Sequence, residues 1–511
     1  MISSRTKSRV TKNPRTSARV VAHLSSRCGP FGWRAFREGL RALMAGLMFC
    51  AACGWANAQQ PAKAVDYSKL PARSSPAWVR DGVIYEIFER DFSDGGNFNG
   101  VTDQLDRLKE LGVNILWLMP VHPISQLKKK GTLGSPYAAQ DYYAVNPAYG
   151  TQDDLKRLVR ESHKRGMKVI IDIVANHTGW DSVMMKTPDF YTRDASGKVI
   201  PPNPDWVDVA DLNYDNPQLR QYMTEMLKHW LREYDLDGFR CDVAGMIPTN
   251  FWEHARTELE KIKPEIVMLA EWHEPDLLAK AFDLDYSWPL HSTLTDVLMG
   301  DMPATALRAA WEDESAKFER GALHMRFSDN HDERRAIARF GEKGALAASA
   351  FVFTLDGVPM LYNGMEVGDT AESGAPALFE RIPILWGISE RRPQFPRFYQ
   401  EFIALRRAHA ALRRGGVEWL HNGDESRVVT YLRRGQGEEL LVAINFSNRS
   451  FVGTVVTEGG EAFQDITPDI APPLPPDAPA PDNARKMRSL ASLPALSLDA
   501  WGFRVFRRAV K

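Results

Sequence analysis

Short apolar runs alternate with amphipathic stretches of helical spacing from about residue 80 to residue 410. This alternation is typical of parallel strands joined by crossover helices. The helical stretches include 103–112 and 153–166, each of which ends in Gly, and 218–234. The strand-like runs are 82–88, 114–121, 168–177, 237–244, 266–272, 282–287, 324–332 and 359–364. Eight such runs predict an α/β protein with a closed (β/α)8 barrel rather than an open sheet.

The barrel is expected to be one part of a longer arrangement. We expect the (β/α)8 catalytic domain at 79–410, with 178–216 as a short inserted subdomain after the third strand. Short strand-like runs separated by Gly, Asn and Ser predict an antiparallel β-sandwich at 411–511. The Pro-rich segment 471–481 is expected to be a loop, and 59–78 a linker.

The first 58 residues predict a secretory leader. Residues 1–40 are rich in Arg and Lys, an apolar run follows at 42–58, and its last three residues resemble a cleavage site before Gln59. Cleavage there predicts an exported protein, periplasmic or secreted, without a stable membrane span. The length of the leader leaves open a start codon downstream of Met1.

Two alternatives for the leader stay open. A membrane anchor is one, although the apolar run is short for a span. A lipoprotein attached through Cys50 or Cys53 is the other, although neither cysteine has a good preceding pattern. Cleavage would leave Cys241 as the remaining cysteine, so no internal disulfide is expected. Its place on an apolar face favours a buried, inert thiol over a nucleophile.

Composition excludes some function classes. The chain has 511 residues and a formal net charge of −1, whereas nucleic-acid binders usually carry a basic excess. An enzyme for phosphorylated substrates would need a Gly-rich phosphate loop or a basic mouth, and neither appears near the predicted strand ends. A neutral substrate fits this charge balance.

The segment 237–244, DGFRCDVA, places a cation and an anion on one face of a strand-like run. Side chains alternate along a strand, so Arg240 and Asp242 point one way and Phe239 and Cys241 the other. A fixed positive charge beside a carboxyl group favours its ionised form. The pattern fits a structural salt bridge and also a nucleophile that must stay charged.

Three carboxylates follow strand-like runs: Asp242, Glu271 and Asp332. Cleavage of a glycosidic bond needs two, and a retaining mechanism uses one as nucleophile and one as acid/base. Asp242 beside Arg240 suits the nucleophile. Glu271 beside Trp272 suits the general acid, because a partly apolar setting raises a carboxyl pKa. One isolated carboxylate would more often be a salt-bridge partner, but three at successive strand ends favour a catalytic site.

Four motifs resemble those of a known family. DIVANH (172–177), GFRCD (238–242), the Glu of LAEW (269–272) and FSDNHD (327–332) occur in this order. Together they resemble the conserved regions of the α-amylase family, glycoside hydrolase family 13. The resemblance extends from about residue 82 to 450, and segments 134–151 and 210–217 resemble further parts of that family.

The resemblance implies catalytic roles by position. Asp242 matches the nucleophile, Glu271 the acid/base, and Asp332 the third carboxylate, which holds sugar hydroxyls and helps to distort the ring. Arg240 matches the partner of the nucleophile.

The resemblance also implies substrate contacts. His177 and His331 match histidines that bond the sugar on the non-reducing side of the cut, and Tyr137 matches the aromatic platform for that sugar. Asp172 and Asn176 match positions that brace the site from below.

One departure from the family concerns the residues after the nucleophile motif. Many members have Lys-His there, where this chain has Gly245 and Met246. The pair helps to form reducing-side sugar sites, and its His backbone often contributes to calcium binding, so both features are in doubt. Asn176 and Asp211 remain possible oxygen ligands for a structural calcium, and hydrogen bonding of Asn176 to a barrel loop is the alternative. No cofactor is expected for the chemistry, and no zinc-site spacing is present.

The expected function is retaining hydrolysis of α-1,4 bonds in starch-derived malto-oligosaccharides by an exported enzyme, with an α-glucan or oligosaccharide as substrate and no nucleic acid as partner. A transglycosylase or isomerising enzyme, or an α-1,6-glucosidase of the same family, is the first alternative. A non-catalytic carbohydrate-binding relative is the second, and the presence of all three carboxylates argues against it.

Overall fold

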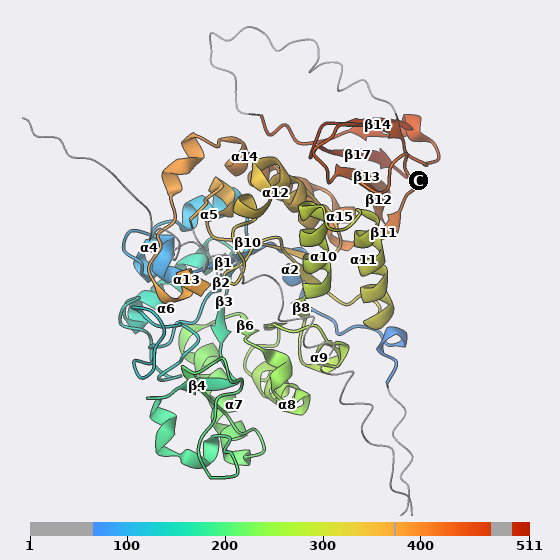
Figure 1. Ribbon diagram of the computed structural model, residues 1–511. Coiled ribbons are helices and arrows are strands. Elements are labelled where there is room, and N and C mark those ends of the chain that lie inside the picture. Colours follow the sequence, from blue (N-terminus) through green and yellow to red (C-terminus); the bar gives the residue numbers. More distant parts are fainter. Residues whose placement is uncertain (1–64, 372–374, 472–492, 511) are drawn as a thin grey trace, which may run out of the picture. The chain divides into compact units, whose positions relative to one another are not determined.

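Eight parallel strands close into the predicted barrel. The computed structural model describes residues 65–371, 375–471 and 493–510. Each strand-like run contributes one barrel strand: β1 (Ile84–Ile87), β2 (Ile115–Leu118), β3 (Lys168–Ile173), β6 (Gly238–Cys241), β7 (Val267–Ala270), β8 (Leu284–Tyr286), β9 (His324–Arg326) and β10 (Val358–Tyr362). The order around the barrel is β1-β10-β9-β8-β7-β6-β3-β2. The predicted (β/α)8 fold is confirmed (Figure 1).

Several strands are shorter than the apolar runs that predict them. β3 ends at Ile173, β6 at Cys241 and β9 at Arg326, so the polar residues that end these runs lie beyond the barrel strands, at the C-terminal rim. The side chains of 237–244 are predicted to alternate between the two faces of a strand. This alternation ends at Asp242. Val243 adopts a left-handed conformation with φ +38°, and the chain turns there into a short 3-10 helix.

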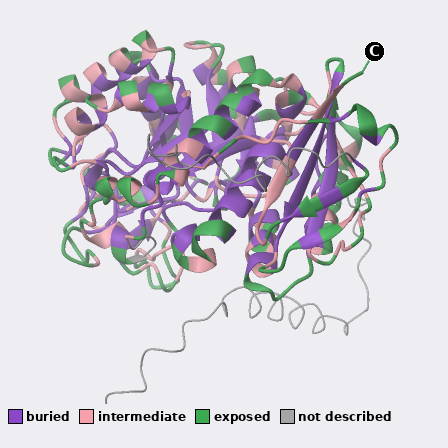
Figure 2. Ribbon diagram, turned by 90° about the horizontal axis from the view of Figure 1, so that it is seen from above, coloured by how far each residue is buried: buried purple, intermediate pink, exposed green. Residues whose placement is uncertain are grey.

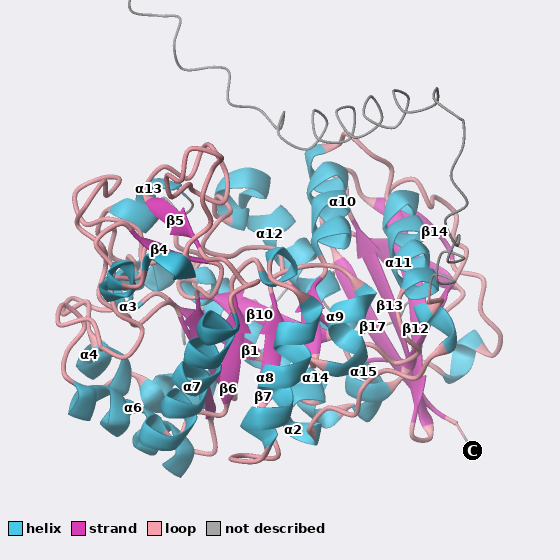
Figure 3. Ribbon diagram, turned by 90° about the horizontal axis from the view of Figure 1, so that it is seen from below, coloured by secondary structure: helices cyan, strands magenta, loops and turns pink. Residues whose placement is uncertain are grey.

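Helices surround the strands of the barrel (Figure 3). Figure 2 shows their inner sides buried and their outer sides exposed, as the amphipathic spacing of the sequence predicts. The helices are α2 (Ala77–Arg80), α3 (Glu89–Phe92), α4 (Phe98–Thr102), α5 (Leu105–Leu111), α6 (Gln152–Lys164), α7 (Pro217–Tyr234), α8 (Thr249–Glu260), α9 (Pro275–Lys280), α10 (Trp288–Met299), α11 (Thr305–Lys317), α12 (Ala336–Thr354), α13 (Ala375–Phe379), α14 (Gln394–Ala408) and α15 (Ala410–Arg414).

Local signals in the sequence set the helix ends. Gly112 follows α5 with φ +101°, the left-handed conformation that glycine adopts without steric cost. α6 begins with a capping box, in which Thr151 and Asp154 bond each other's backbone amides. α7 begins with Asn216 as the cap and Pro217 as its first residue.

The segment between β3 and α7, where an inserted subdomain is predicted, contains short elements that are not part of the barrel. It contains the antiparallel pair β4 (His177–Gly179) and β5 (Val209–Asp211). The 3-10 helices η2 (Val183–Lys186) and η3 (Pro188–Phe190) lie between them. This segment follows the third barrel strand, and its first strand begins at His177.

In its described residues, the C-terminal region contains two antiparallel sheets. The larger has the order β11 (Gly416–Trp419), β12 (Val428–Gly435), β13 (Glu438–Asn445), β17 (Phe503–Ala509), β15 (Gln464–Asp465), and the smaller pairs β14 (Phe451–Thr454) with β16 (Ala495–Leu498). Leu441, Phe451 and Leu496 belong to one apolar cluster that both sheets share. The opposite face of the larger sheet packs on the barrel, where Tyr431 hydrogen-bonds Thr354 of α12 (2.6 Å).

The predicted leader lies outside the described residues, as does most of the Pro-rich segment. In the described part of the predicted linker, η1 (Tyr67–Lys69) and α2 are ordered turns, and Arg73 forms an ion pair with Glu260 of α8. Among the described residues, no helix has both the length and the apolar character needed to cross a membrane.

Candidate active site

The guanidinium of Arg240 lies at the centre of the candidate site, where it contacts three carboxylates. Arg240 is fully buried on β6. Its Nη1 donates to Asp172 on β3 (2.9 Å) and to Asp242, one residue beyond β6 (3.0 Å). Its Nη2 forms an ion pair with Glu271, one residue beyond β7 (2.9 Å). Because β3, β6 and β7 are neighbours in the barrel, the two predicted catalytic carboxylates lie side by side.

Glu271 has a second contact that fixes its orientation. The backbone N–H of Val243 donates to Glu271 Oε2 at 2.8 Å. Val243 is a β-branched residue at positive φ, a costly conformation that turns its amide towards Glu271. Asp242 is therefore positioned by β6, which it follows directly. Glu271 is positioned by the backbone amide of Val243 in the strained turn.

A second set of contacts joins Tyr137, His331 and Asp332. Tyr137 Oη donates to Asp172 (3.0 Å) and lies 2.8 Å from His331 Nε2. The same nitrogen lies 3.2 Å from Asp332 Oδ2. The Tyr137 ring stacks on the His331 ring, with centroids 5.3 Å apart. The side chain of Asp332 is 39% exposed and that of Asp242 10%, so Asp332 faces the open side of the site.

His177, the first residue of β4, borders this group. Its buried ring hydrogen-bonds the backbone of Tyr137 and lies 5.6 Å from the ring of Trp206. Burial lowers the pKa of His177 to about 4. The ring is therefore neutral at working pH, with one nitrogen that donates and one that accepts. All seven residues predicted for the site are brought together.

The charge balance of the site follows from burial. Burial raises the pKa of Asp242 well above its usual range, and the neighbouring Glu271 carboxylate raises it further, while Arg240 opposes both effects. Burial also raises the pKa of Asp172, to about 6, against the effect of Arg240. One guanidinium is shared among three carboxylates, so the charge of Arg240 does not offset the effect of burial on the pKa of Asp242, contrary to the expectation from the sequence.

Two residues of the site escaped the sequence analysis. Glu86 of β1 hydrogen-bonds His331 Nδ1, and Tyr286 of β8 accepts from Arg240 Nε at 3.3 Å. Glu86 had a signal, because an acidic residue inside the apolar run GVIYEIF is unusual unless it has a buried partner. Tyr286 carried no such sequence signal, because tyrosine is common in buried strands.

The departure at Gly245 has a structural explanation. A Cβ atom at this position would lie 2.2 Å from the Trp272 indole, far inside van der Waals contact. Trp272 follows Glu271 directly in the chain and is half-buried. The indole therefore occupies the space that a side chain at 245 would need.

The two oxygen donors considered for calcium do not make a site by themselves. The Asn176 amide nitrogen lies 3.3 Å from Nδ1 of the adjacent His177, which is on β4 and not in a barrel loop, and Asp211 lies on β5. Calcium takes about six to eight oxygen ligands. We therefore assign calcium no part in the chemistry of this site.

His331 gives a prediction about pH. Burial disfavours its charged form, but Asp332 and Glu86 outweigh burial and raise the pKa of His331 to about 9. A raised histidine pKa stabilises the fold fully below about pH 6.5, and this stabilisation is lost as pH rises through about 9. The shift corresponds to at most about 3 kcal/mol. We expect the melting temperature of the wild type to fall between pH 6.5 and 9.5 by more than that of His331→Gln; parallel melting curves would contradict the assignment.

Comparison with known proteins agrees with this geometry. The model of the α-amylase catalytic domain matches residues 67–401. A cyclomaltodextrinase from a Bacillus species is 29% identical over 72% of this chain and 73% of its own length. An intracellular maltogenic amylase of Bacillus subtilis is 28% identical over 73% and 70%. The crystal structure of an α-amylase from Lactobacillus plantarum superposes with a TM-score of 0.72 at 29% identity, covering 84% of this chain and 99% of that one. The chain belongs to the α-amylase family of glycoside hydrolases.

Proposed function

We propose that this protein is a retaining glycosidase that cleaves α-1,4 bonds in malto-oligosaccharides. The observation that carries the proposal is the arrangement around Arg240, which holds Asp242 and Glu271 side by side. A retaining mechanism needs two carboxyl groups close together, one as the nucleophile and the other as the acid/base. The relatives named cyclomaltodextrinase and maltogenic amylase support an α-glucan substrate. Enzymes of this family need no cofactor for the reaction.

In the proposed reaction Asp242 attacks the anomeric carbon while the bond from that carbon to the bridging oxygen breaks. Glu271 gives its proton to the departing oxygen, and the sugar remains bound to Asp242 as an ester. Glu271, now ionised, takes a proton from water, and the resulting hydroxide displaces Asp242 from the anomeric carbon. In this scheme Asp332, His331 and His177 bond sugar hydroxyls, and Tyr137 supports the ring.

The role of Glu271 is testable with two substrates. Glu271→Gln removes the acid, so turnover of a malto-oligosaccharide should fall by about 10³-fold. A nitrophenyl glycoside needs little protonation of its leaving group. The variant should therefore release about one equivalent of nitrophenol per enzyme in a rapid burst and then stall, because the second step lacks its base.

Glu274→Gln is the matched control. Glu274 lies on the same loop but is half-exposed and pairs with Lys317. It should turn over both substrates as the wild type does. Equal slowing of the two substrates by Glu271→Gln, without a burst, would remove Glu271 from the acid role.

The reaction type is tested by product analysis. The protein is incubated with a malto-oligosaccharide of one length, and the products are separated over time. Hydrolysis gives only shorter sugars, and their lengths distinguish endo from exo action. Products longer than the substrate would assign the protein as a transglycosylase instead, and no change at all would contradict the α-1,4 proposal.

We propose in addition that the enzyme is exported by its basic, apolar leader and cleaved before Gln59. The proposal rests on the leader sequence alone, and the Bacillus subtilis relative is named as intracellular. Fractionation of the producing cells with N-terminal sequencing of the protein tests it. A mature N-terminus at Gln59 outside the cytoplasm is expected, and an intact leader on cytoplasmic protein would reverse the proposal.

A further inference from the structure

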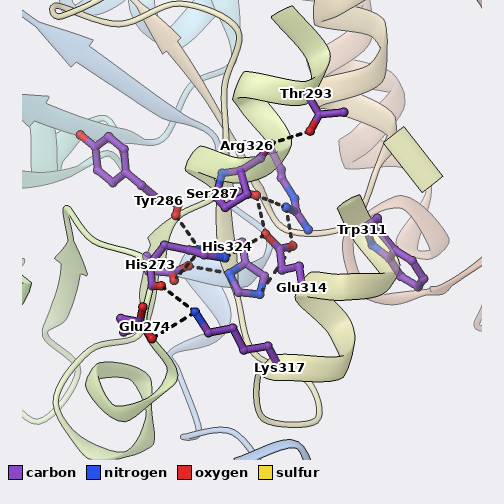
Figure 4. Close-up of polar contacts among 12 residues, drawn as sticks. His273, Glu274, Tyr286, Ser287, Thr293, Trp311, Glu314, Lys317, His324 and Arg326 are labelled. Atoms are coloured by element: carbon purple, nitrogen blue, oxygen red, sulfur yellow. Dashed lines mark hydrogen bonds and ion pairs between the residues drawn. The ribbon is translucent and has the colours of Figure 1, made fainter. Parts of the chain in front are cut away.

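A second group of polar side chains lies outside the sugar site. His273 lies on the loop after β7, Glu314 on α11, and His324 at the start of β9. Figure 4 shows the three side chains pointing toward one another. The possible ligand atoms of the three lie within 4.8 Å of one another. None of these residues takes part in the sugar chemistry described above.

The far nitrogen of each imidazole is already occupied. His324 Nδ1 lies 2.5 Å from Asp285 Oδ1. His273 Nδ1 lies 3.0 Å from the Tyr286 carbonyl and 3.2 Å from Asp285 Oδ2. These partners are acceptors, so each Nδ1 carries the hydrogen and donates it. A carboxylate or carbonyl behind the ring is the support that protein histidines have when their other nitrogen binds a metal.

In the neutral rings the near nitrogens face Glu314 with their lone pairs. His324 Nε2 lies 3.7 Å and His273 Nε2 lies 4.0 Å from the Glu314 oxygens. Both distances are too long for hydrogen bonds. With Nδ1 as the donor of each ring, three acceptors converge on one point, which is the requirement for a cation.

Glu314 is held in place from its other side. Arg326 Nη1 lies 2.6 Å from Oε1, and Ser287 Oγ donates to Oε2 at 2.5 Å. A carboxylate oxygen has a second lone pair, so both contacts leave Glu314 able to ligate. If both imidazoles are neutral, the two carboxylates of Asp285 and Glu314 and the guanidinium of Arg326 together carry a formal charge of −1. A bound divalent cation would make that charge positive.

We propose that His273, His324 and Glu314 bind one Zn²⁺ ion, with a fourth position open to water. Two imidazole nitrogens and one carboxylate oxygen suit zinc and neighbouring transition metals, whereas calcium and magnesium prefer oxygen ligands. His273 is the most exposed of the three, at 12%, so the ion enters from its side.

The ion would tie three elements together. His273 lies two residues after Glu271, so zinc joins the loop of the proposed acid/base to α11 and β9. Its expected role is structural, since Arg240 and Val243 orient Glu271 without it. The competing arrangement is a pair of imidazolium ions balanced by Asp285 and Glu314, which would bind no metal.

Zinc binding is tested directly on the untagged protein. The chain is stripped with EDTA, exchanged into buffer at pH 8 and titrated with Zn²⁺, with Mg²⁺ as a parallel probe. We expect about one zinc per chain to remain bound after gel filtration. The melting temperature should rise by about 3 °C at a hundredfold excess over Kd, with no rise in Mg²⁺. Retention of no zinc would overturn the proposal in favour of the imidazolium pair.

A matched pair of variants locates the ion. His273→Gln should lose both the bound zinc and the rise in melting temperature, whereas His421→Gln, at an exposed histidine, should keep both. Zinc retained equally by His273→Gln would place binding elsewhere and refute the site. If His273→Gln does not fold, Co²⁺ added to the wild type decides: visible absorption of a four-coordinate nitrogen and oxygen site supports the proposal, and a spectrum of hydrated Co²⁺ contradicts it.

Discussion

Asp242→Asn is expected to lower turnover of malto-oligosaccharides by at least about 10⁴-fold, because the amide cannot form the ester with the sugar. Its fold should be as stable as that of the wild type or slightly more stable. Burial and Glu271 raise the pKa of Asp242, which means that its charged form destabilises the folded state. Steady-state kinetics and thermal unfolding at pH 7 measure the two effects on one preparation.

Asp235→Asn is the control for this variant. Asp235 is 73% exposed at the C-terminal end of α7, so its replacement should leave turnover unchanged. If Asp242→Asn instead lost much stability and kept substantial activity, Asp242 would be a structural partner of Arg240 and not the nucleophile.

Arg240→Met is expected to cause the largest loss of stability, about 3–5 kcal/mol. The substitution keeps much of the side-chain volume but leaves Asp172, Asp242 and Glu271 without their cation. Without it the pKa values of the buried Asp172 and Asp242 rise further in the folded state. The variant should therefore be least stable at high pH and recover part of the loss as pH falls. Urea unfolding at pH 8 and pH 5 measures both effects.

Two further variants make this test specific. Arg240→Met combined with Asp172→Asn should lose less stability than the sum of the single changes, because one of the stranded charges is removed. Arg414→Met, at a half-exposed pair with Asp81, should cost less than about 1 kcal/mol. A loss in Arg240→Met that is the same at both pH values would show that packing, and not charge, makes Arg240 important.

The sequence predicts which segments form barrel strands better than it predicts where those strands end. An apolar run indicates a buried strand, but the apolar residues continue beyond the last backbone hydrogen bond to the neighbouring strand. Val174 and Ala175 are as buried as Ile173, yet β3 stops before them because the chain turns at the rim. A residue that is buried in a loop and a residue that is buried in a paired strand are both apolar in the sequence. Only the position of the neighbouring strand shows which of the two a residue is.

The site was predictable where each residue carried its own signal. Carboxylates and histidines after strand-like runs located Asp242, Glu271, Asp332 and His331. Partners from distant strands had no such signal, as with Tyr286. The proposed zinc ligands could be predicted even less well. His273, Glu314 and His324 follow no sequence motif, and they come together only when β7, α11 and β9 are assembled.

The close approach of Trp272 to Gly245 also couples what these two positions can hold. Lysine at 245, as in many family members, has no room while the indole is in place. Either the indole moves or a smaller residue replaces Trp272, and both changes would alter the surroundings of Glu271. Residues 245 and 272 therefore share one volume, and a larger side chain at 245 would be felt beside the proposed acid/base.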